Sequence, residues 1–327
     1  MRLYTIEPRD EWPARAAHSG AAIDRRESTT LWNERCCVEL SMRDADSLQA
    51  HAEILYDEMV RLTDHAIEGQ HLSEFDIPLE EKRIIARSWE MGDYTPTLCT
   101  RLDYLMETDG VPRFLGIREG FSAGMIEAAV TQWNWAVESA PWATQFNTIS
   151  ERLTESWREY YLTGHTVHVA FNPDDLRDTR SAEYLWHSAL SAGVNARALP
   201  LTALCLDTKT GTLVDGTGEH IEVLVTDHHN TRIAGSTLWQ HTDRMDICLI
   251  EPHWKRLWHS PQWRDYCKRA AGTSSGIPTL DTNSESHSGL VCSVWIVAGK
   301  VSGVGFSRKA PCTEAHAWEF IPHLLVR

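Results

Sequence analysis

The feature that most constrains the fold of this chain is a β-α-β pattern near its centre. An apolar run, VHVAF, occupies residues 167–171 and is followed by a turn that contains Pro173. Helical spacing then extends over 179–192, and a second apolar run lies near 194–199. Two strands joined through a helix run parallel, so the pattern predicts a small parallel-sheet lobe.

The residues before this unit favour a helix-rich part that also contains strands. Apolar side chains spaced by three and four predict a helix over 44–66, which Ser41-x-x-Asp44 would cap. Further helices are expected over 79–89, 124–137 and 146–160. Residues 98–106 and 113–117 read as two strands of a hairpin that turns at Asp109-Gly110.

The residues after the unit favour strands. We expect a hairpin over 203–215, a strand over 222–226, and a last hairpin that joins 290–297 to 301–306 through Ala298-Gly299-Lys300. Residues 272–289 are rich in Gly, Ser, Thr and Asn and indicate a loop. Together these patterns predict an α+β protein.

Charge and cysteine content limit the classes of function. A formal net charge of -15 argues against nucleic-acid binding, which needs clustered Lys and Arg. The same charge would attract polyamines, although solubility alone also explains it. The chain shows no apolar run of the ~18 residues that a membrane span needs and no signal sequence, so we expect a cytoplasmic protein. The eight cysteines form no C-x-x-C pair, so neither a zinc knuckle nor a redox motif is indicated.

Several short motifs occur in an order that resembles the glutathionylspermidine synthase-like acid-amine ligases of the ATP-grasp type. They are Thr100-Arg101-Leu102-Asp103, Glu127-Ala128-Ala129 with Gln132-Trp133-x-Trp135, Gln145-Phe146-Asn147, Ile250-Glu251-Pro252-x-Trp254-Lys255, and the closing hairpin into Phe320-Ile321-Pro322-His323. Each motif is moderately specific by itself, and their shared order over nearly the whole chain carries the resemblance.

The resemblance implies a fold in which two lobes clamp ATP while a carboxylate is activated as an acyl phosphate for attack by an amine. In the best-known members the acid is glutathione and the amine is spermidine. By the resemblance, Arg101 would steady the transferring phosphoryl group and Asp103 would bind magnesium. Ser122, Glu127 and Arg308 would contact the substrate.

The chain departs from the family where ATP and metal would be held. Gly116-Ile117-Arg118 stands in place of a Glu-x-Asn metal-binding pair, and an arginine repels a divalent cation rather than coordinating it. Ser260-Pro261 stands where the family has a lysine. A Lys-Pro strand and a phosphate-covering loop are missing, and 272–289 take their place. We therefore expect an ATP-grasp-like, pre-ATP-grasp architecture with part of the ATP-grasp lobe deleted.

Each candidate residue also has a structural interpretation. Arg101 and Asp103 share one face of a strand, where they could line a cleft or form a structural ion pair. Glu127 could contact substrate or be an exposed helix residue. Arg308 lies one position beyond strict alignment with the family's arginine, which falls on Ser307.

The sequence also leaves undecided the role of one stretch rich in histidine and of one rich in tryptophan. A metal could be held by members of the set His228, His229, His241, Cys248, His253 and His259, although their spacing matches no zinc motif. Trp254, Trp258 and Trp263 recur at helical intervals and could form a packing stripe or an exposed patch for a protein partner.

The sequence favours a ligase-family protein that has lost ATP-dependent ligation and binds a small amine or peptide ligand or a protein partner. Because the loss of one catalytic donor costs ~10²–10³ in rate, losing several together argues against catalysis. No cofactor is then expected. The alternative is an active acid-amine ligase that uses ATP and Mg²⁺ on an amino acid, peptide or polyamine. We expect three parts, at 1–160, 161–245 and 246–327, or one interleaved unit.

Overall fold

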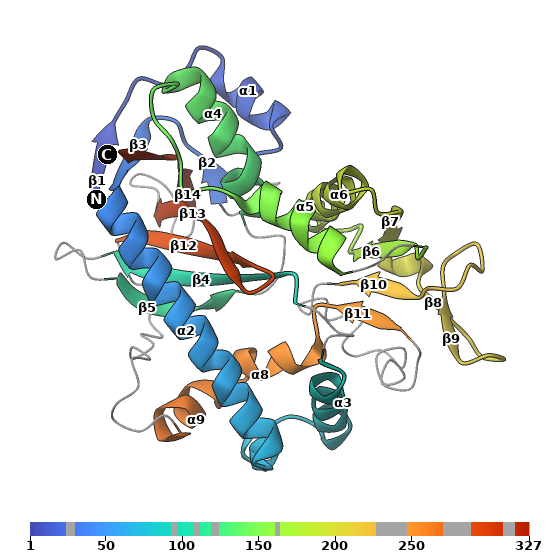
Figure 1. The fold of residues 1–327 in the computed structure, drawn as a ribbon. Helices are drawn as coiled ribbons and strands as arrows, with labels where there is room; N and C mark the ends of the chain where they lie inside the picture. The colour runs from blue at the N-terminus through green and yellow to red at the C-terminus, as the bar shows by residue number, and fades with distance from the viewer. Residues whose placement is uncertain are drawn as a thin grey trace.

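The computed structural model describes residues 1–23, 30–92, 97–106, 112–118, 124–160, 164–226, 247–270, 289–309 and 318–326. It shows an α+β protein in which a mixed sheet lies beside a smaller parallel-sheet lobe (Figure 1). In the described residues no helix combines the length and apolar character needed to span a membrane.

The largest sheet has six strands in the order β2-β14-β13-β12-β4-β5. Their bounds are Thr30–Trp32, Trp318–Ile321, Lys300–Lys309, Leu290–Val297, Cys99–Met106 and Pro112–Arg118. Strands β4, β12 and β13 are successive antiparallel neighbours, so the predicted closing hairpin pairs with the strand that carries Arg101 and Asp103. This sheet therefore joins residues from both ends of the chain.

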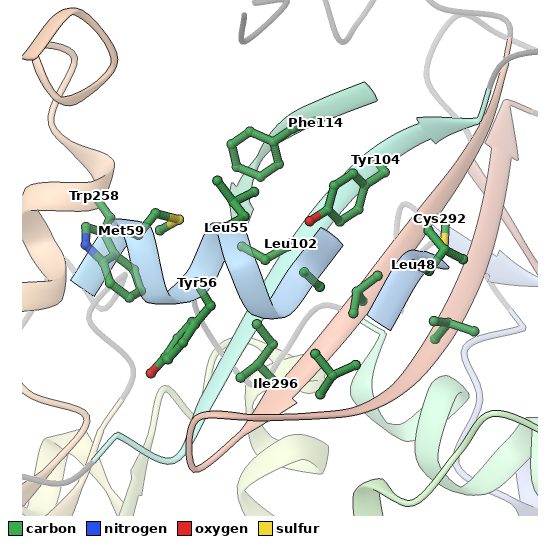
Figure 2. Close-up of a cluster of buried hydrophobic side chains, with 14 of the residues drawn as sticks. Leu48, Leu55, Tyr56, Met59, Leu102, Tyr104, Phe114, Trp258, Cys292 and Ile296 are labelled. Atoms are coloured by element: carbon green, nitrogen blue, oxygen red, sulfur yellow. The ribbon is translucent and has the colours of Figure 1, made fainter. Parts of the chain in front are cut away.

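The long helix α2 (Met42–Glu68) crosses one face of this sheet (Figure 1). Its first turn has the predicted capping box, in which Ser41 and Asp44 satisfy one another's backbone N–H groups. Figure 2 shows its buried face meeting the sheet, with Leu48, Leu55, Tyr56 and Met59 from the helix and Leu102, Tyr104, Phe114, Cys292 and Ile296 from the strands. Burial of each large apolar side chain stabilises the fold by about 1.5–3 kcal/mol.

The shorter helices on the α2 side surround the far end of that helix. They are η1 (His71–Glu74), α3 (Leu79–Glu90), η6 (His253–Lys255), α8 (Arg256–His259) and α9 (Trp263–Ala270). Trp254, Trp258 and Trp263 are buried in the apolar core that α2 shares with the sheet and these short helices. The packing interpretation of these three tryptophans is confirmed, and the exposed-patch interpretation is wrong for them.

The opposite face of the six-stranded sheet is covered by helices from the middle of the chain. These are a π-helical turn η3 (Glu127–Thr131), which continues into α4 (Gln132–Ser139), and α5 (Ile149–Glu159). A second apolar core lies here and includes Trp135, Trp157 and Trp295. The short helix α1 (Trp12–His18) packs against this core through Ala16.

The predicted β-α-β unit is confirmed as a parallel sheet. Strand β6 (Val167–Phe171), helix α6 (Leu176–Ser191) and strand β7 (Ala196–Pro200) form it. The strands β10 (Val223–Val225) and β11 (Cys248–Ile250) complete the order β11-β10-β6-β7. After η4 (Leu201–Ala203), the predicted hairpin is formed by β8 (Cys205–Asp207) and β9 (Thr212–Val214).

A third sheet of three strands, in the order β1-β3-β15, was not predicted. Strand β3 (Cys36–Ser41) pairs antiparallel with β1 (Arg2–Thr5) and parallel with β15 (His323–Val326). The six-stranded sheet takes strands from 1–160 and 246–327, and the parallel sheet takes β11 from beyond residue 245.

One glycine of β13 allows a close contact between the sheet and the segment before α5. A Cβ added to Gly303 would lie 3.1 Å from the carbonyl oxygen of Phe146 and 3.2 Å from the Cα of Asn147. We expect Gly303→Val to lower the free energy of unfolding by about 1–3 kcal/mol through overpacking, as measured by urea denaturation. Gly216→Ala is the control, because its added Cβ would meet Ala203 at an ordinary 3.4 Å. Equal stability of the two variants would contradict the expectation.

Candidate functional site

Arg101 and Asp103 lie on the face of β4 that is turned away from α2. They occupy alternate positions of the strand and therefore share that face. The Arg101 guanidinium donates from Nη2 to Asp103 Oδ2 over 2.9 Å, and the Ser293 hydroxyl donates to Asp103 Oδ1 over 2.7 Å. The two residues are brought together as the sequence predicts, in a charge-assisted hydrogen bond.

Two residues of β12 complete the surroundings of this pair. In the sheet register Ser293 is opposite Asp103, and Trp295 is opposite Arg101. The guanidinium carbon of Arg101 lies 5.7 Å from the centre of the Trp295 ring, within the range of a cation–π interaction. The Arg101 and Asp103 side chains are only 14% and 11% exposed, so solvent screens their interaction weakly.

The described groups around Asp103 do not fit magnesium. The residue opposite Asp103 on the neighbouring strand β5 is Gly116, which has no side chain to offer an oxygen. Both oxygens of the Asp103 carboxylate already accept hydrogen bonds, from Arg101 and Ser293. Mg²⁺ needs near-octahedral oxygen ligands, and in the described part of the chain a single engaged carboxylate beside a guanidinium does not provide them.

The predicted metal set gives no further support to a metal site. Among the described residues, no three His, Cys, Asp or Glu side chains lie close enough together to hold a metal ion. Cys248, His253 and His259 belong to that part of the chain, whereas His228, His229 and His241 lie outside it.

Glu127 lies at the start of the π-helical turn, on the same side of the sheet as Arg101. Its Oε1 accepts a hydrogen bond from the backbone N–H of Ala22 over 3.3 Å. Burial raises the pKa of the Glu127 carboxyl, and Arg180 and Arg177 on α6 act in the opposite direction from a distance. Glu127 is partly buried, so its interpretation as an ordinary exposed helix residue is wrong.

The turn that carries Glu127 is close to Arg101. A Cβ placed on Gly124, one helical turn before Ala128, would lie 4.0 Å from Nη1 of Arg101 and 3.8 Å from the ring of Phe320. The segment that leads into Glu127 therefore lies beside Arg101 over this face of the sheet, while the Glu127 carboxylate contacts the backbone of Ala22. The predicted substrate residue Ser122 lies outside the described residues.

Arg308 lies on the other face of the sheet. It follows Ser307, which is opposite Val291 in the register and so shares the face of Ser293 and Asp103. Arg308 points to the α2 side, where Nε donates to Glu319 over 3.2 Å and Nη2 to the sulfur of Cys36 over 3.1 Å. The structure does not bring Arg308 together with Arg101 and Asp103.

A buried ion pair that was not predicted holds the beginning of β4. Glu251 and Lys255 are 4% and 1% exposed and bind one another through Oε2 and Nζ. Lys255 Nζ also donates to the carbonyl oxygen of Cys99 over 2.7 Å, and Glu251 Oε1 accepts from the backbone N–H of Leu98 over 2.9 Å. In the sequence, the Glu-Pro-x-Trp-Lys motif could have indicated this ion pair, because its two charged residues are four positions apart, the spacing of one helical turn.

The matches to known proteins include a family model and a solved structure. A family model described as the glutathionylspermidine synthase pre-ATP-grasp matches residues 3–262. A solved structure described as a glutathione synthetase-like effector from Globodera pallida, in its apo form, is 11% identical with a TM-score of 0.48. The match covers 98% of this chain and 98% of the effector chain.

Proposed function

This chain belongs to the glutathionylspermidine synthase pre-ATP-grasp family, and from that premise we propose that it binds a small amine or peptide ligand without ATP-dependent ligation. The observation that carries the proposal is the register of β4 and β5, which sets Gly116 beside Asp103. A ligase of this type would need oxygen ligands there to hold the metal that offsets phosphate charge.

The side chains of Glu127 and Arg101 suit a ligand with charged ends. The Glu127 carboxylate would accept hydrogen bonds from an ammonium group, and the Arg101 guanidinium would donate to a carboxylate. The partly buried setting strengthens both interactions relative to water. An amine or a short peptide carries these groups. We propose a cytoplasmic setting, where the seven described cysteines, all free thiols, would stay reduced.

The rival function is an active acid-amine ligase, and the retained Arg101–Asp103 pair favours it. Calorimetric titration with ATP and Mg²⁺ separates the two. We expect no binding in the micromolar range. Micromolar binding, or ADP released in the presence of glutathione and spermidine, would overturn the proposed loss of ligation.

The amine-binding part of the proposal is tested with spermidine and glutathione as probes. We expect Glu127→Gln to weaken binding of the amine at least about tenfold, because a hydrogen bond to a charged group contributes about 1.5–3 kcal/mol. Isothermal titration calorimetry would measure the dissociation constants. Glu155→Gln is the control, since Glu155 is half-exposed on α5 and pairs with Arg152. Equal affinities for the two variants, or no binding of either probe, would count against the proposed site.

A protein partner is a further possibility that the family leaves open. The described tryptophans with the largest exposure are Trp142 and Trp133, at 74% and 49%. The ligand proposal does not depend on this surface.

A further inference from the structure

The helix that contains Glu127 winds more widely there than an α-helix. The backbone N–H of Gln132 bonds the carbonyl oxygen of Glu127, five residues earlier, over the π-helical turn Glu127–Thr131. Such turns are rare, and single π-helical turns inside α-helices are frequent at functional sites. Sequence spacing predicts an ordinary helix here, so other contacts must favour the wider turn.

Two side-chain amides donate to the carbonyl oxygens of this turn. Gln132 Nε2 donates to the oxygen of Ala128 over 2.6 Å, and Asn147 Nδ2 donates to the oxygen of Ala129 over 3.2 Å. Gln132 is fully buried, and its Nε2 also donates to the carbonyl oxygen of Val304 in β13 over 2.9 Å. The Gln132 amide thus links a carbonyl of the turn to strand β13 of the six-stranded sheet.

A buried histidine fixes the direction of the Gln132 amide. His323 Nε2 accepts from the backbone N–H of Phe146 over 3.1 Å, so in the neutral ring Nδ1 carries the hydrogen. That Nδ1 lies 2.9 Å from Gln132 Oε1 and donates to it, which leaves Nε2 of Gln132 to face the carbonyls. Gln145 supports the same region by donating to the carbonyl oxygens of Gln132 and His323, each over 2.9 Å.

We propose that Gln132 and Asn147 are positioning residues for Glu127: their amides hold the π-helical turn that directs the Glu127 carboxylate toward Ala22 and the candidate ligand site. The inference rests on the proposed function for the role of Glu127 as a ligand-binding group. In this inference the Gln-Trp-x-Trp and Gln-Phe-Asn motifs have the same role, which is to stabilise the π-helical turn. Both motifs supply an amide to one turn, Gln132 from the first residue of α4 and Asn147 from the loop that joins α4 to α5.

The geometry defines what losing an amide would do. The π-helical turn contains one residue more than an α-helical turn does. If it relaxes to an α-helix, that extra residue shifts the helix register by one position, which corresponds to a rotation of about 100°. The side chains before the turn would then rotate relative to those after it. Glu127 would leave the backbone N–H of Ala22 and become more exposed, while the core residues of α4 would stay in place.

The test measures the pKa of the Glu127 carboxyl by carbon NMR on protein labelled at glutamate. The Glu127 signal is the one that disappears in Glu127→Gln. In the wild type we expect a raised pKa, because the carboxyl is withdrawn from water. In Gln132→Met and Asn147→Leu we expect it to fall toward the ordinary value of about 4.3. No ligand is needed, so failure of the spermidine titration leaves this readout intact.

The control is Gln145→Met, which loses hydrogen bonds to Gln132 and His323 but none to a carbonyl of the turn. It should lower the melting temperature while the pKa of Glu127 stays raised. A folded Gln132→Met variant that keeps the raised pKa would overturn the proposal, because the amide would then be merely structural. An ordinary pKa in the wild type would overturn it as well, even if both variants failed to fold.

Discussion

Replacing Lys255 with methionine is expected to lower the free energy of unfolding by about 3–5 kcal/mol, the usual cost of removing one partner of a buried ion pair. Lys255 is 1% exposed, and its Nζ binds Glu251 and the carbonyl oxygen of Cys99. Methionine fills a similar volume, so the loss arises from the buried Glu251 carboxylate rather than from a cavity. Urea denaturation followed by tryptophan fluorescence measures it.

The double variant Glu251→Gln with Lys255→Met separates charge from packing. Without either charge, the double variant should be more stable than Lys255→Met alone, because no uncompensated carboxylate remains. Arg269→Met is the surface control. Arg269 pairs with Glu74 at an exposed position, and its loss should cost less than about 1 kcal/mol. A Lys255→Met variant as stable as Arg269→Met would contradict the buried pair.

Acidification is expected to destabilise the protein through His323. His323 is fully buried, and burial lowers its pKa from 6.5 to about 3. The unfolded chain therefore binds a proton between these values while the folded chain does not, and stability falls as the pH falls. The contribution is complete above pH 6.5 and decreases by about 1.4 kcal/mol for each pH unit below it.

At pH 5 the His323 contribution has fallen by about 2 kcal/mol. The measurement compares urea unfolding of the wild type and of His323→Gln at pH 7 and pH 5. The variant is less stable at pH 7, since it loses the hydrogen bonds to Phe146 and Gln132, but it should lose about 2 kcal/mol less on going to pH 5. Burial also lowers the pKa of His168, which acts in the same direction in both proteins. Identical pH dependence in the two proteins would exclude His323 as the source.

Short sequence patterns predicted the elements that are stabilised by contacts between residues close together in the sequence. The 44–66 periodicity and its Ser41 cap correspond to α2, and Ala298-Gly299-Lys300 joins β12 to β13 as expected. The β-α-β unit followed from alternating segment types alone. The same reasoning placed Arg101 and Asp103 on one face, because strand alternation fixes which side chains are neighbours.

The remaining features depend on contacts between distant segments. The π-helical turn at Glu127 needs an amide from Asn147 and a buried histidine from β15, and no local spacing encodes these. Arg308 could not be assigned to a face without the register of β13, since a shift of one residue moves a side chain to the other side of a sheet. The buried state of Lys255 likewise follows only from the packing around it.

Strand β3 forms its sheet with partners taken from the two extremes of the sequence. β1 and β15 flank it, and β14 joins the larger sheet beside β2 in the same way. During synthesis on the ribosome, the edges of β2 and β3 that pair with β14 and β15 must therefore stay uncovered until residues 318–326 emerge. Contacts across such separations close slowly, and open edges invite association with other nascent chains. Chaperone demand should consequently be greatest late in translation, when most of the chain is present but these edges are still unpaired.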